Sequence, residues 1–442
     1  MTHTHKTTAS GINVYILNNE AVIDSEAEAM LQALHSRSTG WLMSHLKILA
    51  EKWASKFMSQ FYVGYGHKSI GDCWSTTLFI EWISMLGAKA IQDTKLYNGQ
   101  EASTRYVDFS KQPMINPLWT QEGVDFLEKQ RAFYLSLLDP LKTYISELYP
   151  RAEWQDEKVY MKTVNAKAFD ISRWFLPAGC STNLARHTTL RQIADRILVL
   201  RHHPLPEIQE VALAIEQAVL EKYPNSFSDK RYDASETYVD ITQKQYYKSN
   251  TQVKDFEINY DAIDRKQLEE FLPIINARPN NKTELPTYID NAGVISFSYT
   301  LDFGSFRDVQ RHRAPYQRMP LLTTDIGFNE RYLSSLPPVL RQQAEDYLQS
   351  IEKSLNALTI DPALKQYYTP MGYLLSCEMM GTLPALVYVS EIRSSTYVHP
   401  TLRKVAIKLG RYLKEKHNIT VFLDESEDEF DTRRWNHDIE IK

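Results

Sequence analysis

Two segments of this 442-residue chain share one pattern, about half a chain length apart. In the first half, Leu200-Arg201 precedes the amphipathic segment 207–223 (EIQEVALAIEQAVLEKY). In the second half, Ile392-Arg393 precedes a segment of the same kind, 401–417 (TLRKVAIKLGRYLKEKH). Self-similarity at such a long spacing constrains the fold strongly, because it indicates two copies of one structural unit in tandem.

A second pair of segments supports the repeat. Residues 93–95 (Asp-Thr-Lys) and 311–313 (Arg-His-Arg) each follow a β-branched residue and Gln, and both lie after a long apolar stretch. We therefore predict two diverged copies, the first over residues 12–224 and the second over residues 286–425.

The region between the copies differs in composition. Residues 225–285 are polar and rich in Tyr, Asp, Lys and Asn, with one amphipathic island at 261–271. We interpret this region as a polar linker with a short helix. Elsewhere, apolar periodicity predicts a strand at 294–303 and helices at 123–148, 190–200, 207–223, 339–355 and 400–417. Residues 69–91 combine large apolar residues at helical spacing with good strand formers, so their type stays open.

Charge and cysteine usage exclude several classes of protein. The three cysteines lie far apart without a CxxC pair, which argues against a disulfide framework and a zinc site. A net charge of −5 without a basic stripe disfavours nucleic-acid binding. The most apolar stretch, 76–91, is broken by Glu81 and Lys89, and no secretory signal is visible. We expect a cytoplasmic protein with no metal site and no membrane role.

Three short segments carry side chains suited to anion binding. Residues 311–313 combine two guanidinium groups with an imidazole, as phosphate or pyrophosphate recognition needs, although a solvated basic turn is the alternative. In an extended segment, Glu101, Ser103 and Arg105 share one face and could hold a nucleotide; a half-exposed polar strand is the alternative. Residues 66–69 (Gly-His-Lys-Ser) suit an anion at a helix start.

Together these segments resemble the flavin-dependent thymidylate synthases. The signature of that family is Arg-His-Arg, seven arbitrary residues and then Ser, with Glu two residues before that Ser and Arg two residues after it. In this chain the signature is divided between the halves. After residues 311–313 the Ser position holds Leu321, whereas after residues 93–95 it holds Ser103, flanked correctly by Glu101 and Arg105.

Further segments match the family in the same order along the chain. His67 and Ser69 resemble a segment that precedes the signature, and Leu176-Pro177 resembles the start of the family's C-terminal portion. Arg393 and His399 resemble the nucleotide-binding Arg and the flavin-contacting His. The resemblance implies an α+β fold in two tandem thymidylate synthase-like copies, each a mixed sheet packed with helices.

The resemblance also implies an activity. It is the methylation of dUMP or a related pyrimidine nucleotide with FAD, a methylenetetrahydrofolate donor and NADPH as reductant. Ser103 would orient the substrate and Arg393 would stabilise developing enolate charge. The family's roles assign nucleotide binding to Glu101, Ser103, Arg105, Arg201 and Arg393, and FAD binding to His67, Ser69, Arg311, His312, Arg313 and His399.

Two further expectations follow from the resemblance. The family assembles as a tetramer, so a tandem chain would form a homodimer that is a pseudo-tetramer. Asp93 places an anion where the family has a cation, which makes phosphate binding beside that loop unfavourable. A non-catalytic flavin- or nucleotide-binding descendant, acting as a sensor or an assembly partner, is therefore the alternative function.

Overall fold

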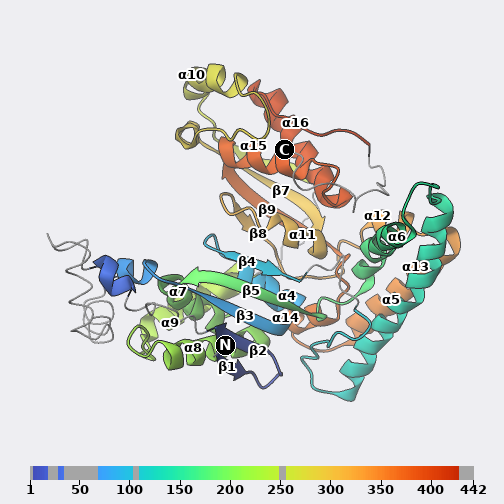
Figure 1. Cartoon of the computed structure of the whole chain (residues 1–442), viewed down its shortest axis with the longest axis horizontal. Coiled ribbons are helices and arrows are strands. Elements are labelled where there is room, and N and C mark those ends of the chain that lie inside the picture. The colour runs from blue at the N-terminus through green and yellow to red at the C-terminus, as the bar shows by residue number, and fades with distance from the viewer. Residues whose placement is uncertain (1–2, 18–27, 34–67, 103–108, 248–254, 428–442) are drawn as a thin grey trace. The chain divides into compact units, whose positions relative to one another are not determined.

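A computed structural model describes residues 3–17, 28–33, 68–102, 109–247 and 255–427. The chain divides into two compact units, each assembled from separate stretches (Figure 1). The N-terminal unit comprises Met1–Ala102, Gln112–Pro117 and Cys180–Tyr247, and the C-terminal unit comprises Ser103–Lys111, Leu118–Gly179 and Lys248–Lys442.

A five-stranded antiparallel sheet forms the centre of the N-terminal unit, in the order β1-β2-β3-β5-β4. The strands are β1 His3–Thr7, β2 Asn13–Leu17, β3 Ser75–Ser84, β4 Asn98–Glu101 and β5 Ser181–Thr189. Figure 1 shows β5 between β3 and β4. Leu78 and Ile80 of β3 are buried and alternate with more exposed neighbours, so one face of this strand belongs to the core.

Helices cover that apolar face of the N-terminal sheet. They are α4 Met85–Gln92, α7 Leu190–Arg201 and α8 Pro206–Lys222. The helix α9 Asp233–Tyr246 and the 3₁₀ helix η2 Lys68–Asp72 pack against α7. The hydroxyls of Ser84 and Thr189 accept hydrogen bonds from the first turns of α4 and α7, which fixes where these helices begin. Ile193 of α7 and Ile208 of α8 are buried in the core.

A four-stranded antiparallel sheet forms the centre of the C-terminal unit, in the order β6-β7-β9-β8. The strands are β6 Phe256–Asp261, β7 Val294–Asp302, β8 Tyr316–Arg318 and β9 Leu374–Thr382. Associated with them are α10 Arg265–Asn276, η4 Thr287–Ala292, α11 Phe303–Val309, α15 Leu383–Arg393 and α16 Pro400–His417.

A layer of helices completes the C-terminal unit. Its members are α5 Gln121–Leu148, α6 Glu157–Ser172, η3 Arg173–Phe175, α12 Glu330–Ser334, α13 Pro338–Ala357, α14 Pro362–Lys365 and η5 Gln366–Tyr368. The rings of Phe133 on α5 and Tyr347 on α13 stack at 3.8 Å, and Gln130 donates a hydrogen bond to the carbonyl of Tyr368 at 2.9 Å. Helices distant in sequence therefore pack through aromatic contacts.

The two units share an order of elements. In the N-terminal unit β3, α4 and β4 come first and β5, α7 and α8 follow; in the C-terminal unit β7, α11 and β8 come first and β9, α15 and α16 follow. The strand orders β2-β3-β5-β4 and β6-β7-β9-β8 correspond position by position. The α+β class is confirmed. All strand pairs among the described residues are antiparallel, however, so the predicted mixed sheets are wrong.

The structure also refines the predicted elements. The predicted helices correspond to α5, α7, α8, α13 and α16, and the predicted strand corresponds to β7. Residues 69–91 divide at Ser84 into β3 and α4, which explains their ambiguous composition.

The region 225–285 is more than a linker. It contains α9, β6 and α10, and β6 is the edge strand of the C-terminal sheet. Its strand was missed because the alternation of Phe256 and Ile258 with Glu257 and Asn259 is short, lies within a polar region and leaves most of these residues exposed or half-exposed. The segment 118–179, inside the predicted first copy, packs within the C-terminal unit.

Candidate functional site

The Arg-His-Arg segment forms the turn between α11 and β8 of the C-terminal unit. The Asp302 carboxylate begins α11 by accepting a hydrogen bond from the Ser305 amide at 2.8 Å. At the other end, the His312 amide donates to the carbonyl of Val309 at 3.0 Å. The Gln317 side-chain amide then donates to the carbonyl of His312 at 2.6 Å, so the turn is held from both sides.

Arg393, the last residue of α15, meets this turn. Its Nε donates to Nε2 of His312 at 2.6 Å, and its Nη2 donates to the carbonyl of Asp308 at 2.8 Å. The edge of the His312 ring lies against the Tyr388 ring, with 5.8 Å between centroids. Because Nε2 accepts, the neutral imidazole carries its proton on Nδ1.

The electrostatics of this contact keep the imidazole neutral. Burial and the Arg393 charge lower the pKa of His312 to about 3. Burial also lowers the pKa of Arg393, and the nearby Arg311 adds to that effect while Asp308 and Tyr388 oppose it. At neutral pH the turn therefore presents permanent guanidinium charge beside an uncharged ring.

The outer part of the turn is accessible. Arg311 is exposed and Arg313 is half-buried, and Tyr388 exposes 41% of its surface. Guanidinium groups beside an exposed aromatic ring can bind a phosphate or a pyrophosphate and contact a ring system. We call Arg311, His312, Arg313 and Arg393 the cationic cluster.

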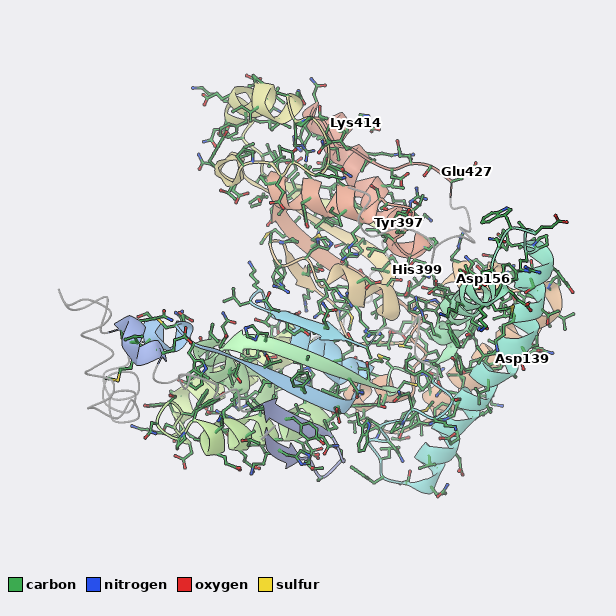
Figure 2. The ribbon with its side chains drawn as sticks, viewed as in Figure 1. Asp139, Asp156, Tyr397, His399, Lys414 and Glu427 are labelled. Atoms are coloured by element: carbon green, nitrogen blue, oxygen red, sulfur yellow. The ribbon has the colours of Figure 1, made fainter. Side chains whose placement is uncertain are left out.

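His399 lies in the interior of the C-terminal unit, at the start of α16 (Figure 2). Its Nδ1 is 2.8 Å from the Thr401 hydroxyl, and its ring contacts Trp174 edge-on at 5.0 Å between centroids. Only 7% of His399 is exposed, so its described environment is a buried polar and aromatic core.

In the N-terminal unit, Asp93 follows α4 as Arg311 follows α11. Its carboxylate accepts from Lys89 Nζ at 2.9 Å and from the Tyr246 hydroxyl at 3.0 Å. Burial raises the pKa of Asp93, but Lys89 and Arg196 outweigh it, and the net direction is downward. This carboxylate is thus ionised and neutralised by its own unit.

Arg201 ends α7 as Arg393 ends α15. Its Nη1 donates to Glu216 at 2.9 Å, and its Nη2 donates to Glu236 of α9 at 2.5 Å. Glu216 also binds Arg231. Carboxylates of the chain therefore occupy the donors that a phosphate would use.

The remaining predicted residues of the first half are only partly visible. Glu101 ends β4 and accepts a hydrogen bond from the Gln92 side chain at 2.6 Å, which places it beside the turn of residues 93–95. Ser69 lies in η2, where its carbonyl accepts from the Cys73 thiol. His67, Ser103 and Arg105 lie outside the described residues.

The structure thus brings together Arg311, His312 and Arg393 from separate segments. It adds Tyr388 and Asp308, which sequence reasoning missed. A tyrosine within the otherwise apolar stretch 383–389, shortly before Arg393, was a usable signal for Tyr388. The contact with Asp308 could not be predicted, because every residue has a backbone carbonyl and the sequence does not show which carbonyl accepts a hydrogen bond.

The described part of the chain contains neither a metal-binding cluster nor a membrane-spanning helix. No group of three or more His, Cys, Asp or Glu residues there could hold a metal ion. Among the helices that the structure describes, none is both long and apolar enough to cross a bilayer.

The fold and the cluster define an α+β protein with a cationic site suited to phosphate groups. Residues 20–225 match the family model described as thymidylate synthase complementing protein, which makes this part of the chain similar to that family.

Relatives similar to this chain over most of its length are named UPF0159 proteins. The one from Chlamydia muridarum is 25% identical, over 85% of this chain and 82% of its own length. The one from Chlamydia pneumoniae is 23% identical, over 81% and 78%. The one from Thermoplasma acidophilum is 20% identical, over 83% and 87%. These alignments cover more of the chain than the family match does.

Proposed function

We propose that this protein is a flavin-dependent thymidylate synthase-like methyltransferase acting on dUMP or a related pyrimidine nucleotide. The observation that carries the proposal is the family match over residues 20–225. The cationic cluster supports it, because nucleotide and flavin phosphates are anions that guanidinium groups bind well.

The cluster fits the phosphates of FAD. Arg311 is exposed and stands close enough to Arg393 to affect its pKa, so two permanent cations converge on one region. Arg311 and Arg313 would hold the pyrophosphate, and the neutral His312 and the Tyr388 ring would contact a ring system. When bound, FAD would supply the hydride, with methylenetetrahydrofolate and NADPH as co-substrates.

The residues of this chain would bind and orient the substrate. Arg393, fixed by His312 and Asp308, would direct its positive charge at the developing enolate of the pyrimidine. The family resemblance assigns nucleotide binding to Glu101, Ser103 and Arg105, with Ser103 orienting the base. His67, Ser69 and His399 keep their expected role in flavin binding as part of this proposal.

The shared order of elements supports a duplication. Both units follow the same sequence of strands and helices, and their strand orders correspond. A chain that contains two such units would form a homodimer in place of a tetramer. Size-exclusion chromatography with light scattering tests this, and a monomeric mass would contradict it.

The test of the activity begins with the visible spectrum of the pure protein. We expect a yellow protein that reductant bleaches, and we expect Arg311→Ala with Arg313→Ala to lose the colour. Arg411→Ala is the matched control, since this exposed arginine pairs with Glu425 on the surface of the same unit. Tritium release from uracil-C5-labelled dUMP then measures catalysis. A protein that stays colourless after addition of FAD would rule the proposal out.

The ion pairs of the N-terminal unit favour a second candidate function. Asp93 is paired with Lys89, and Arg201 is held by two glutamates, so these positions are neutralised internally. A non-catalytic flavin- or nucleotide-binding descendant would retain such a unit for assembly or sensing. Flavin binding without tritium release from any pyrimidine nucleotide would favour this candidate over the enzyme.

A further inference from the structure

Arg186 is an arginine in the interior of the N-terminal unit. It lies in β5 between Leu78 of β3 and Gly99 of β4, and only 2% of it is exposed. Its Nε is buried and finds no hydrogen-bond acceptor within the described stretches of the chain. A buried charge without an acceptor costs several kcal/mol, roughly, so such groups are normally paired.

A second guanidinium with the same deficit lies nearby. Arg196 of α7 donates through Nη2 to the carbonyl of Ala90 at 2.7 Å. Its Nε is also buried and has no acceptor among the residues that the structure describes. Burial lowers the pKa of Arg186 to about 10, and the charge of Arg196 adds to that effect. The two cations therefore oppose each other in a poorly solvated region.

One carboxylate, that of Asp93, lies among these cations. It pairs with the buried Lys89, and its charge also acts on Arg196, so one carboxylate faces three cations. Burial, with Lys89 and Arg196, lowers the pKa of His203 to about 3, so its ring is neutral. The described neighbourhood thus holds an excess of two positive charges.

We propose that Arg186 and Arg196 bind a small oxyanion of the phosphate class inside the N-terminal unit. The oxyanion would accept hydrogen bonds from both guanidinium groups, including the two Nε donors that otherwise lack acceptors. Its residues belong to the N-terminal unit, whereas the cationic cluster belongs to the C-terminal unit, and the proposal does not depend on flavin or methyl-transfer chemistry. The oxyanion is either free inorganic phosphate or the phosphate of a nucleotide.

Thermal unfolding of the full chain tests the site. Inorganic phosphate, compared with chloride at equal ionic strength, should raise the Tm by about 3–5 °C once it is well above its dissociation constant. The increase should disappear in Arg186→Met and in Arg196→Met. It should persist in Arg191→Met, a control on the same helix as Arg196, because Arg191 is exposed and pairs with Asp72. Arg186→Met should also retain flavin colour, which separates this test from the one on Arg311 and Arg313.

A parallel titration with dUMP separates the two sources. If phosphate and dUMP both raise the Tm through Arg186, the site takes the free anion. If only dUMP does so, the oxyanion is a nucleotide phosphate. If neither anion raises the wild-type Tm, the proposal is overturned; an Arg186→Met variant as stable as the wild type without added anion would then show that the guanidinium is merely buried.

Discussion

The carboxyl ends of α7 and α15 carry the same residue in opposite settings. Arg201 ends α7 and is bound by Glu216 and Glu236, whereas Arg393 ends α15 and donates to a neutral imidazole and a backbone carbonyl. The first arginine is neutralised by carboxylates, and the second keeps its charge available beside the exposed Arg311. Two arginines at corresponding positions can therefore differ in chemistry, because their neighbouring side chains decide whether the charge is neutralised.

The helix α9 accounts for most of this difference. It supplies Glu236 to Arg201, and its last residue, Tyr246, donates to Asp93. The next residue, Tyr247, contacts His203 at 2.6 Å. All these partners lie in the N-terminal unit, so α9 covers the end of α7 with groups that compete with any anion.

The largest expected effect is the loss of stability when Glu391, which lies close to Arg393 in α15, is replaced. Two residues before Arg393, Glu391 forms a buried two-point ion pair with Arg278 and accepts from the Phe422 amide at 2.9 Å. Glu391→Ala should destabilise the protein by about 3–5 kcal/mol, because it leaves Arg278 buried without its partner. Urea unfolding measures this loss. Glu391→Gln removes the charge but keeps one acceptor oxygen, so it should lose somewhat less. Equal losses in the two variants would mean that the charge alone carries the stabilisation, and a negligible loss in Glu391→Ala would contradict the prediction.

The next largest effect is expected when Asp93, which neutralises Lys89 in the N-terminal unit, is replaced. Asp93→Ala should cost about 2–3 kcal/mol, since it leaves the buried Lys89 ammonium without a carboxylate. Asp139→Ala is the control, because Asp139 pairs with Lys142 at the surface. Unfolding free energies of both variants would show whether Asp93 is structural; a loss no larger than that of Asp139→Ala would mean that it is not.

The next prediction concerns how stability depends on pH, because each unit contains a buried histidine that stays neutral. His203 and His312 each have a folded pKa of about 3, well below the ordinary value of 6.5 for histidine. The unfolded chain binds more protons than the folded chain between these values, so stability is present above pH 6.5 and is lost as pH falls toward 3. Each histidine should contribute up to about 1.4 kcal/mol per pH unit within this window.

Unfolding of His312→Gln from pH 7 to pH 5 measures one of these contributions. Glutamine offers an acceptor to Arg393 but does not titrate, so the loss on acidification should shrink by about 2 kcal/mol relative to wild type. His187→Gln is the control, because His187 is exposed on β5. An unchanged pH profile in His312→Gln would show that the imidazole is not held neutral.

The smallest effect is expected at Glu236. Glu236→Ala removes one of the two carboxylates at Arg201, and both groups are partly exposed, so the loss should be about 0.5–1 kcal/mol. Unfolding at low and high salt measures it, with Lys244→Ala on the same helix as the control. A loss above that range would mean that α9 anchors the unit more firmly than these contacts indicate.

Sequence reasoning predicted the regular elements well where one face is apolar. The helices α5, α7, α8, α13 and α16 and the strand β7 follow from periodicity, which is a local property. It missed β6, whose residues are largely exposed, and it expected mixed sheets where the pairing is antiparallel. Whether two strands pair parallel or antiparallel depends on the path of the chain between them, and no local sequence pattern encodes that path.

At the site, sequence chemistry found residues but not their partners. The Arg-His-Arg segment was identified from its residue types, and Arg393 was identified from the internal repeat and the family resemblance; the family match covers residues 20–225. His312 lies 81 positions from Arg393, and their contact needs the turn after α11 to meet the end of α15. The burial of His399 among Trp174 and Thr401 likewise comes from segments far apart in the chain.

The sequence by itself determined the positions of the main helices and the residue types of the Arg-His-Arg segment, and its resemblance to a known family implied the α+β class. These depend on residue type, spacing and periodicity, which act over a few neighbours. Only the tertiary structure decided which arginines are neutralised, which histidines stay uncharged and which guanidinium groups are buried without acceptors. Those properties depend on the distance between charges and on the exclusion of water, and folding sets both.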